Sequence, residues 1–510
     1  MSIILVSTII ALLAITNPTN GSLCYVKDPV RGGFFIYDSS KASINNGGTV
    51  LNGWVRQYSG AANVQWFGAK GDGSDDSDAF QKAFDSEATV IEVPNVDKYY
   101  KVKNLILPEG KTLRGIGRKR IYNPYELSHV EGSCCIIYDT SGSSFIRFEG
   151  RNTIENINFY GVNRSIPAIA DNSGSGLNFK NVSSCGFKVG LGNINTYTRV
   201  TWLRDCHVAQ NTVGIGGLID SHVHGCEINA NTTGVYQPTG ANDTQFVENK
   251  VEWNTAEGYE FYANSSCSII GGVIDRNYMT GIKIVAATVN VTGCVLRRNG
   301  RDNTTTGSHF NIEGGSVFAS NLVTKVGKDD NGNGNTAPQY IFYLAGNTSD
   351  NKVYASNSDL TGYVSSFKNT DSGELVFSNN KGVKDTTRYL GNKSATISKS
   401  GTSSFNTPVE NLTPTSNYNL GKSYTINVHV RNTQWGFYFG KFNIIIAREG
   451  GNAFVGKSLN VFQTNTIALS GGSVMNVSIA NIADDGSSFD VVCTATGNGN
   501  YQTLVKVIEE

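Results

Sequence analysis

Three short stretches of the chain repeat one pattern: VEWNTAEG at residues 251–258, IDRNYMTG at 274–281 and LRRNG at 296–300. In each, an aliphatic residue, here called the marker, is followed by a charged residue and, three positions after the marker, by Asn. CHVAQNTVG (206–214) and CEINANTTG (226–234) extend the series toward the N-terminus. The markers are Phe187, Val208, Ile228, Val251, Ile274 and Leu296, so the steps are 21, 20, 23, 23 and 22 residues. A step of this size indicates a repeat architecture.

The repeat favours a parallel β-helix over a leucine-rich repeat, because the leucine-rich consensus is absent. Short β-branched strands separated by Asn and Gly fit coils of about 20–23 residues, whose sharp corners need a left-handed backbone. One coil cannot bury its own apolar face, so many coils must stack. The composition agrees with an all-β chain, since 57 Gly accompany only 16% charged residues.

The charge balance excludes one large class of partner. The 510 residues contain 42 Lys and Arg and 42 Asp and Glu, so the formal net charge is zero. A nucleic-acid-binding protein would show a basic excess. We therefore expect no nucleic-acid partner.

Alternation along a strand separates core positions from outward positions. Four cysteines lie two residues before a marker, and we expect them to be reduced and buried in one inward stack: Cys185, Cys206, Cys226 and Cys294. The residue directly after each marker points outward instead. The resulting outer row reads Ala209, Asn229, Glu252, Asp275 and Arg297.

The N-terminal segment has two possible interpretations. Residues 3–15 are apolar like a signal-peptide core, but the first basic residue is Lys27 and no clear cleavage site follows. The alternative is an apolar segment that packs on its own protein or on a partner chain. The run is too short for an ordinary membrane span, and no membrane partner is expected.

The rest of the sequence divides the chain into three regions. Residues 77–85 predict a helix with an apolar stripe that caps one end of the coil stack. Asp72, Asp75 and Asp76 before it are expected to shape a turn and cap the helix. Longer alternating strands after about residue 395 predict an antiparallel β-sandwich. We expect a lead-in region at 1–62, a β-helix with its capping helix at 63–394, and the sandwich at 395–510.

A resemblance to a known family adds to this interpretation. The segment FGAKGDGSDDSDAFQKAF (67–84) strongly resembles the opening motif of pectate-lyase-like β-helix proteins, above all bacteriophage tailspikes that depolymerise capsular polysaccharide. LCYVKDPVRGGFFIYDSS (23–40), NGWVRQY (52–58) and GKDDNGNGNTAPQY (327–340) resemble further parts of the same proteins. The resemblance covers roughly residues 20–390. It implies a right-handed β-helix, a homotrimer, a place in the virion with action outside the host cell, and attachment to a phage tail or adaptor protein.

Glu252 and Asp275 are the predicted catalytic pair. They occupy equivalent places on consecutive coils, where stacking brings strands about 5 Å apart. Glycosidases use two carboxyl groups, about 5–5.5 Å apart in retaining and about 6.5–9.5 Å apart in inverting enzymes. The alternative is a solvated row in which either carboxylate pairs with Arg276 or Arg297.

Other polar residues near this row are candidates for binding substrate. An aromatic ring beside charged hydrogen-bonding groups is typical of a sugar site, and Arg suits an acidic sugar. The predicted set is Trp253, Arg276, Arg297, Arg298, His309, Asp329 and Asp330. Asp220, His222, His224 and Glu227 could form a polar patch, a groove wall or, less favourably, a metal site. We expect neither a metal nor a cofactor.

The sequence thus predicts a tailspike that binds a capsular or O-antigen polysaccharide and hydrolyses its glycosidic bonds. One alternative is a polysaccharide lyase on the same fold, which would need a uronic acid substrate. The other is a glycan-binding adhesin without catalysis. Fold alone does not decide among them.

Overall fold

The computed structural model describes residues 3–117, 134–300, 305–324, 337–345, 350–369 and 374–383, together with the strands between Tyr389 and Glu509. The chain divides into two compact units. The first contains residues 1–373 and 380–383, and the second contains 374–379 and 384–510. The domain boundaries expected after residues 62 and 394 stay predictions.

The N-terminal apolar segment is part of a small folded sheet. Strands in the order β1-β2-β3-β5-β4 form this five-stranded sheet: β1 (Ile4–Val6), β2 (Leu23–Val26), β3 (Gly33–Tyr37), β5 (Trp54–Arg56) and β4 (Val50–Leu51). Helix α1 (Ile9–Leu13) buries Ile9 and Leu12 against Cys24, Phe35 and Trp54. This confirms that the segment packs on its own protein. Within the described chain, no helix is long and apolar enough to span a membrane.

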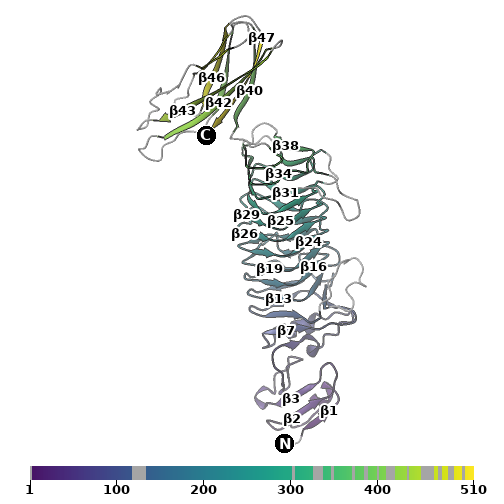
Figure 1. Cartoon of the computed structure of the whole chain (residues 1–510). Coiled ribbons are helices and arrows are strands. Elements are labelled where there is room, and N and C mark those ends of the chain that lie inside the picture. The colour runs from purple at the N-terminus through teal and green to yellow at the C-terminus, as the bar shows by residue number, and fades with distance from the viewer. Residues whose placement is uncertain are drawn as a thin grey trace. The chain divides into compact units, whose positions relative to one another are not determined.

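The middle of the first unit is a stack of coils with three parallel sheets, here called faces 1, 2 and 3 (Figure 1). A typical coil passes from β26 (Thr244–Val247) on face 1 to β27 (Lys250–Glu252) on face 2 and β28 (Tyr259–Phe261) on face 3. The expected all-β parallel β-helix is confirmed.

Face 1 runs through β6 (Ala62–Asn63), β7 (Val90–Val93), β10 (Thr112–Gly115), β13 (Thr153–Glu155), β15 (Asn178–Lys180), β19 (Trp202–Arg204), β23 (His222–His224), β26 (Thr244–Val247), β29 (Ser266–Ile270), β32 (Thr288–Thr292), β35 (Ser316–Ser320) and β37 (Lys352–Ser356). Face 2 contains β8 (Tyr100–Val102), β11 (Cys135–Tyr138), β14 (Asn158–Tyr160), β16 (Ser183–Cys185), β20 (His207–Ala209), β24 (Glu227–Asn229), β27 (Lys250–Glu252), β30 (Val273–Asp275) and β33 (Val295–Arg297). Face 3 contains β17 (Val189–Gly192), β21 (Val213–Gly216), β25 (Thr233–Gln237), β28 (Tyr259–Phe261), β31 (Thr280–Val285), β34 (Ser308–Glu313), β36 (Tyr340–Leu344) and β38 (Ser365–Asn369). Two short parallel pairs supplement them: β9 (Leu105–Leu107) with β12 (Ile146–Phe148), and β18 (Thr198–Arg199) with β22 (Leu218–Ile219).

The repeated Asn forms a buried hydrogen-bonded ladder at the corner between faces 2 and 3. Each side-chain oxygen accepts the backbone N–H of the ladder residue one coil earlier, at distances of 2.9–3.3 Å. The members are Asn211, Asn231, Asn254, Asn277 and Asn299. The repeated Asn therefore gives hydrogen-bond partners to buried backbone N–H groups that would otherwise be unpaired at a sharp corner.

The assignment of Phe187 as the first marker was wrong. Val208 pairs with Ser184, not with Phe187, so that coil is 24 residues long. Phe187 occupies the ladder position instead, where its backbone N–H donates to Asn211 Oδ1 at 2.9 Å. The apolar Phe ring is fully buried there, and it ends the polar ladder.

The four predicted cysteines are reduced and buried as expected, but one of them lies outside the expected stack. All nine cysteines are reduced and buried. Cys206, Cys226 and Cys294 each immediately precede a face-2 strand, in a column that also contains Asn249 and Gly272. Cys185 pairs with Ala209 in the outward row and packs in a cluster with Cys135, Ile137 and Tyr160. The shifted register moves Cys185 because side chains alternate along the strand.

Helix α2 (Ser77–Asp85) confirms the expected capping helix, with its apolar stripe buried at Ala79, Phe80, Ala83 and Phe84. Gln81 holds the helix to β9 by hydrogen bonds of 3.0 and 2.9 Å to the backbone of Ile106. Asp72 and Asp75 bind nearby backbone N–H groups as expected of turn residues. Asp76 was expected to cap the helix as well, but its carboxylate accepts from the backbone of Lys70 and Gly71 instead.

The second unit contains antiparallel strands, as the sequence predicts. One four-stranded sheet has the order β40-β47-β42-β43, with bounds β40 (Tyr389–Ser398), β47 (Asn500–Glu509), β42 (Leu420–Asn432) and β43 (Gly436–Arg448). The other has the order β41-β46-β45-β44, with bounds β41 (Gly401–Pro408), β46 (Ser488–Thr496), β45 (Val474–Ala480) and β44 (Asn465–Ala468). Strand β39 (Glu374–Ser378) also falls in this unit. Face-to-face packing of the two sheets as a sandwich stays a prediction.

Candidate functional site

The predicted catalytic residues lie in one outward-pointing row on face 2. The register places Ala209, Asn229, Glu252, Asp275 and Arg297 side by side on consecutive strands. The prediction that Glu252 and Asp275 occupy adjacent coils is therefore confirmed. Both side chains, however, are covered, so the expected open exposure of this pair is wrong.

Asp275 is enclosed by arginines. Its carboxylate accepts from Arg276 at 2.9 Å, from Arg297 at 3.1 Å and from both Nε and Nη2 of Arg298. Asp275 is 0% exposed and Arg298 only 1%. Three guanidinium groups compensate one buried carboxylate, which is the arrangement a buried charge requires. As folded, neither Asp275 nor Arg298 presents a surface that a sugar could contact.

The corner geometry creates this cluster. Arg276 and Arg298 adopt left-handed backbone conformations with φ of 52° where the chain turns from face 2 toward face 3. Trp253 has the same conformation one coil earlier, and the Arg276 guanidinium lies 4.9 Å from the centre of its ring. Trp253 is half-buried, and Arg297 keeps a third of its side chain exposed. The accessible parts of the cluster are thus an aromatic ring and a guanidinium group.

Glu252 lies at the edge of the same cluster. Its carboxylate is 2.7 Å from Lys250 Nζ, and the residue is 7% exposed. Four cationic groups, Lys250 and the three arginines, thus accompany two carboxylates. This excess of positive charge favours an anionic ligand.

The predicted site residue His309 does not join the cluster. His309 was expected beside the row, but it is fully buried and its Nδ1 lies 3.1 Å from Asn299 Nδ2 at the end of the Asn ladder. It lies in register with Gly281, a position that borders the Asn ladder at the corner between faces 2 and 3, so its ring packs against the ladder and not beside the row. Burial lowers the pKa of His309 to about 3. Asp329 and Asp330 lie outside the described residues.

A second group of polar side chains lies on the outer side of face 3, and the sequence did not reveal it. Tyr236, Glu260, Lys283, Asn311 and Tyr343 form one row in register. Glu260 accepts the Tyr262 hydroxyl at 2.8 Å and pairs with Lys283 at 3.2 Å. The Tyr236 and Tyr262 rings are 5.4 Å apart and half-buried. We call Glu257, Glu260, Lys283, Tyr236 and Tyr262 the face-3 cluster.

Glu257 and Glu260 differ in their surroundings. Burial, followed by the negative charge of Glu260, raises the pKa of the Glu257 carboxyl group. Glu260 has two partners that stabilise a carboxylate, Lys283 and the Tyr262 hydroxyl. A carboxyl group of raised pKa near a second carboxyl group is an arrangement that acid–base catalysis uses.

The sequence signal for this cluster was present but weak. Glu260 stands in EGYEFY nine residues after the marker Val251, beyond the part of the pattern that repeats clearly. The true register of face 3 aligns it with Tyr236 and Lys283. Only coils of correctly assigned length would have brought these three positions together.

The histidine-containing patch lies on face 1. His222 stacks on Trp202 with ring centres 4.2 Å apart, and His224 lies 3.4 Å from Glu248. Among the described residues, no group of three or more His, Cys, Asp or Glu could hold a metal ion. The ring contact makes a polar and aromatic surface patch the better description.

The comparisons with known proteins agree with this architecture. Residues 5–59 match the family described as the phage tail protein small four-stranded beta-sheet domain. A curated relative, the capsule K30/K69-specific depolymerase of Klebsiella phage K64-1, is 26% identical over 312 residues, covering 54% of this chain and 39% of the relative. The chain thus spans well under half of that relative's length.

Solved structures show the same fold. The gp42 tailspike of Acinetobacter phage vb_AbaP_AS12 matches with a TM-score of 0.53 at 12% identity, covering 97% of this chain and 94% of that one. Full-length tailspike protein 2 of Escherichia coli O157:H7 bacteriophage CAB120 also has a TM-score of 0.53, at 14% identity, covering 97% and 79%. The chain therefore has the fold of the phage tailspikes and begins with a segment similar to a phage tail domain.

Proposed function

We propose that the chain is a phage tailspike that depolymerises a capsular or O-antigen polysaccharide on the surface of a bacterial host. The alignment of 312 residues with a protein named as a capsule-specific depolymerase carries the proposal. The tailspike fold and the phage-tail match at residues 5–59 support it. In this proposal the N-terminal sheet attaches the protein to the tail or to an adaptor, and the β-helix meets the polysaccharide outside the cell.

We propose hydrolysis at the face-3 cluster as the main reaction. Glu257, whose carboxyl group has a raised pKa, would donate a proton to the glycosidic oxygen. Glu260, held by Lys283 and Tyr262, would act on the opposite side as a base or nucleophile. Tyr236 and Tyr262 would offer ring faces to the apolar sides of the sugar. The presence of two carboxyl groups in different environments supports this assignment.

The second proposed centre is the face-2 cluster, which consists of Lys250, Glu252, Trp253, Asp275, Arg276, Arg297 and Arg298. Glu252 and Asp275 stay the pair predicted from the sequence, with Glu252 as the group near the surface and Asp275 as the residue that positions the arginines. Arg297 and Trp253 would contact the substrate. The excess of cationic groups here suits a polysaccharide that carries carboxylates.

A lyase is the alternative function that this cationic cluster favours. An arginine beside a uronate carboxylate would stabilise the charge that develops when a base removes the C5 proton. Incubation of the full chain with purified capsular polysaccharide distinguishes the functions. A hydrolase shortens the polymer without forming a conjugated double bond, whereas the unsaturated uronate in a lyase product absorbs in the short-wavelength ultraviolet. Unchanged polymer size, with binding retained, would indicate an adhesin and contradict the proposal.

A further inference from the structure

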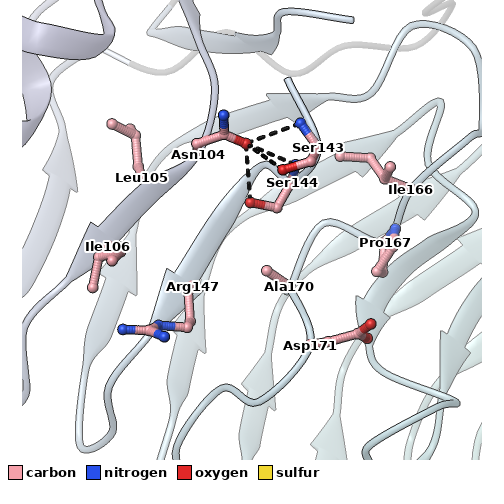
Figure 2. A pocket seen from close by; sticks show the side chains of 10 residues that line it. All are labelled: Asn104, Leu105, Ile106, Ser143, Ser144, Arg147, Ile166, Pro167, Ala170 and Asp171. Carbon is pink, nitrogen blue, oxygen red and sulfur yellow. Dashed lines mark hydrogen bonds between the residues drawn. The ribbon is translucent and has the colours of Figure 1, made fainter. Parts of the chain in front are cut away.

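A pocket of about 330 Å³ opens on the early coils, away from both clusters (Figure 2). Residues from three successive coils line it, namely Asn104, Leu105, Ile106, Ser143, Ser144, Arg147, Ile166, Pro167, Ala170 and Asp171. The coils are neighbours because Leu105 pairs with Ile146 and Ile146 with Ile169. Its volume falls within the range of about 300–1,000 Å³ that small-molecule sites occupy.

The position separates this pocket from the proposed catalytic centres. Face 2 leads from β11, in the coil that contains Arg147, through β14, β16, β20 and β24 to β27, which contains Glu252. These five steps correspond to about 24 Å along the stack at about 4.8 Å per strand. A single sugar unit cannot reach from one site to the other.

The pocket has three kinds of wall. Ser143 and Ser144 supply hydroxyl groups, and Asn104 Oδ1 fixes their loop by accepting both backbone N–H groups at 3.0 and 2.9 Å. Figure 2 shows Arg147 and Asp171 on opposite sides of Ala170, away from the two serines. The remaining wall is apolar and comes from Leu105, Ile106, Ile166 and Pro167.

The two charged groups have capacity for a ligand. Arg147 Nη2 donates to Glu149 at 3.0 Å, and the other guanidinium nitrogens make no hydrogen bond to any residue that the structure describes. Asp171 accepts from Asn193 at 2.9 Å, and the residue is exposed. The guanidinium group can therefore bind a carboxylate, while the Asp171 carboxylate can accept hydroxyl groups.

We infer that this pocket binds one hexuronate unit of an acidic glycan, without cleaving it. A hexuronate carries a carboxylate at one end of its ring and hydroxyl groups at the other, which suits Arg147 and Asp171 on opposite sides of the hollow. Its C–H groups would lie on the apolar wall. The inference goes beyond the proposed function because it concerns retention of the glycan at a place distant from the catalytic centres, and it needs no cleavage.

The test measures binding of two simple probes to the full chain, methyl β-glucuronide and methyl β-glucoside, by saturation-transfer NMR titration. Arg147→Gln should weaken glucuronide binding by about tenfold or more, because a charge-assisted contact is lost. Arg151→Gln is the matched control, since Arg151 lies in the same coil, is 83% exposed at its side chain and does not line the pocket. It should leave binding unchanged.

A second variant keeps the inference testable on the hydroxyl side. Asp171→Asn should weaken both probes, because the amide is a poorer acceptor for sugar hydroxyls. Equal binding of the neutral and the acidic probe to the natural chain would overturn the assignment to an acidic sugar. Absence of glucuronide binding, or binding that neither variant alters, would overturn the site itself. Loss of polymer cleavage is not a readout here, so failure of the proposed function gives a different result.

Discussion

Asp275 and Glu257 are acidic residues on neighbouring coils, yet their surroundings separate their roles. Asp275 accepts hydrogen bonds from three arginines and is fully buried. No arginine in the described part of the chain forms an ion pair with Glu257, and burial raises the pKa of its carboxyl group. A carboxylate that holds three cations in place organises structure, whereas a carboxyl group that retains its proton can donate it.

Replacing Asp275 by Asn should destabilise the protein. The substitution leaves three guanidinium groups without their shared counter-charge, and removal of one partner from a buried ion pair costs about 3–5 kcal/mol. The free energy of unfolding in urea should fall by this order. Asp220→Asn is the control, because Asp220 is exposed and its left-handed backbone, with φ of 51°, suits Asn. An unfolding free energy equal to that of the control would show that the arginines do not depend on Asp275.

The catalytic proposal separates Glu257 from Glu252. Glu257→Gln should lower the rate of polymer cleavage by about 10²–10⁴-fold, since a positioned acid or base contributes about that factor. Glu252→Gln should reduce the rate by a similar factor only if the face-2 cluster is the catalytic centre. The measurement is the initial rate of depolymerisation by the folded variants. Near-normal activity of Glu257→Gln with loss in Glu252→Gln would move the centre to face 2.

The pH dependence follows from the direction of the Glu257 shift. A general acid acts in its protonated form, which prevails below its pKa. Because burial and Glu260 raise that pKa, activity should persist above the ordinary glutamate pKa of about 4.3 and decline as the pH rises through the raised value. A rate profile that already declines near pH 4 would contradict the assignment of Glu257 as the acid.

The Asn ladder determines the stability of the corner between faces 2 and 3. Asn254 accepts the Asn231 N–H at 3.0 Å and donates to Asn277 at 2.8 Å, entirely within the core. Asn254→Ala would leave a buried N–H without its partner, at a cost of about 1–3 kcal/mol. Asn290→Ala on the exposed surface of face 1 is the matched control and should change stability by less than about 0.5 kcal/mol. Chemical denaturation of both variants compares the two costs, and equal losses would contradict a special role for the ladder.

The repeating element was predictable because a coil imposes the same physical demands each time. Asn at the corner, an aliphatic marker and a charged neighbour recur for this reason, and the pattern predicted the coils and the adjacency of Glu252 and Asp275. It did not predict the length of the coil in which Phe187 replaces the ladder Asn. Phe187 is apolar, and it therefore resembles the marker of a coil. The face-3 cluster was also missed, because outward residues on that face share position but not identity: Tyr236, Glu260, Lys283 and Asn311.

Burial of the face-2 row also exceeded what alternation predicts. Alternation places Asp275 outside the coil core. It does not report that the next residue, Arg276, turns back over it through a left-handed corner. Whether an outward side chain is exposed or covered therefore depends on the backbone conformation of the adjacent corner, which the repeat pattern does not report.

At the scale of the whole molecule, one outward row of face 1 carries two exposed aromatic residues, Trp202 and Phe318, which are separated in the row by His222, Gln245, Ser268 and Asn290. Trp202 is 45% exposed and Phe318 is 43% exposed, and each stacks on a ring in the neighbouring coil, at 4.2 and 4.9 Å. Ile270 is 37% exposed in a second row of the same face, in register with Val247 and Thr292. Exposed aromatic rings with polar residues around them mark a candidate protein interface. A second and third copy of the chain are the partners that the tailspike resemblance implies.

We therefore predict a homotrimer in which face 1 is covered. Light scattering on the purified chain should give a mass of about 165 kDa, three times 54.9 kDa. Phe318→Lys should shift the population toward single chains, because a charge would be buried at a closed symmetric interface. Met279→Lys is the matched control, since Met279 has the same 43% exposure but lies in the corner between β30 and β31, away from face 1. A mass near 55 kDa for the natural chain at micromolar concentration would contradict the trimer, and equal dissociation of both variants would contradict the placement of its interface on face 1.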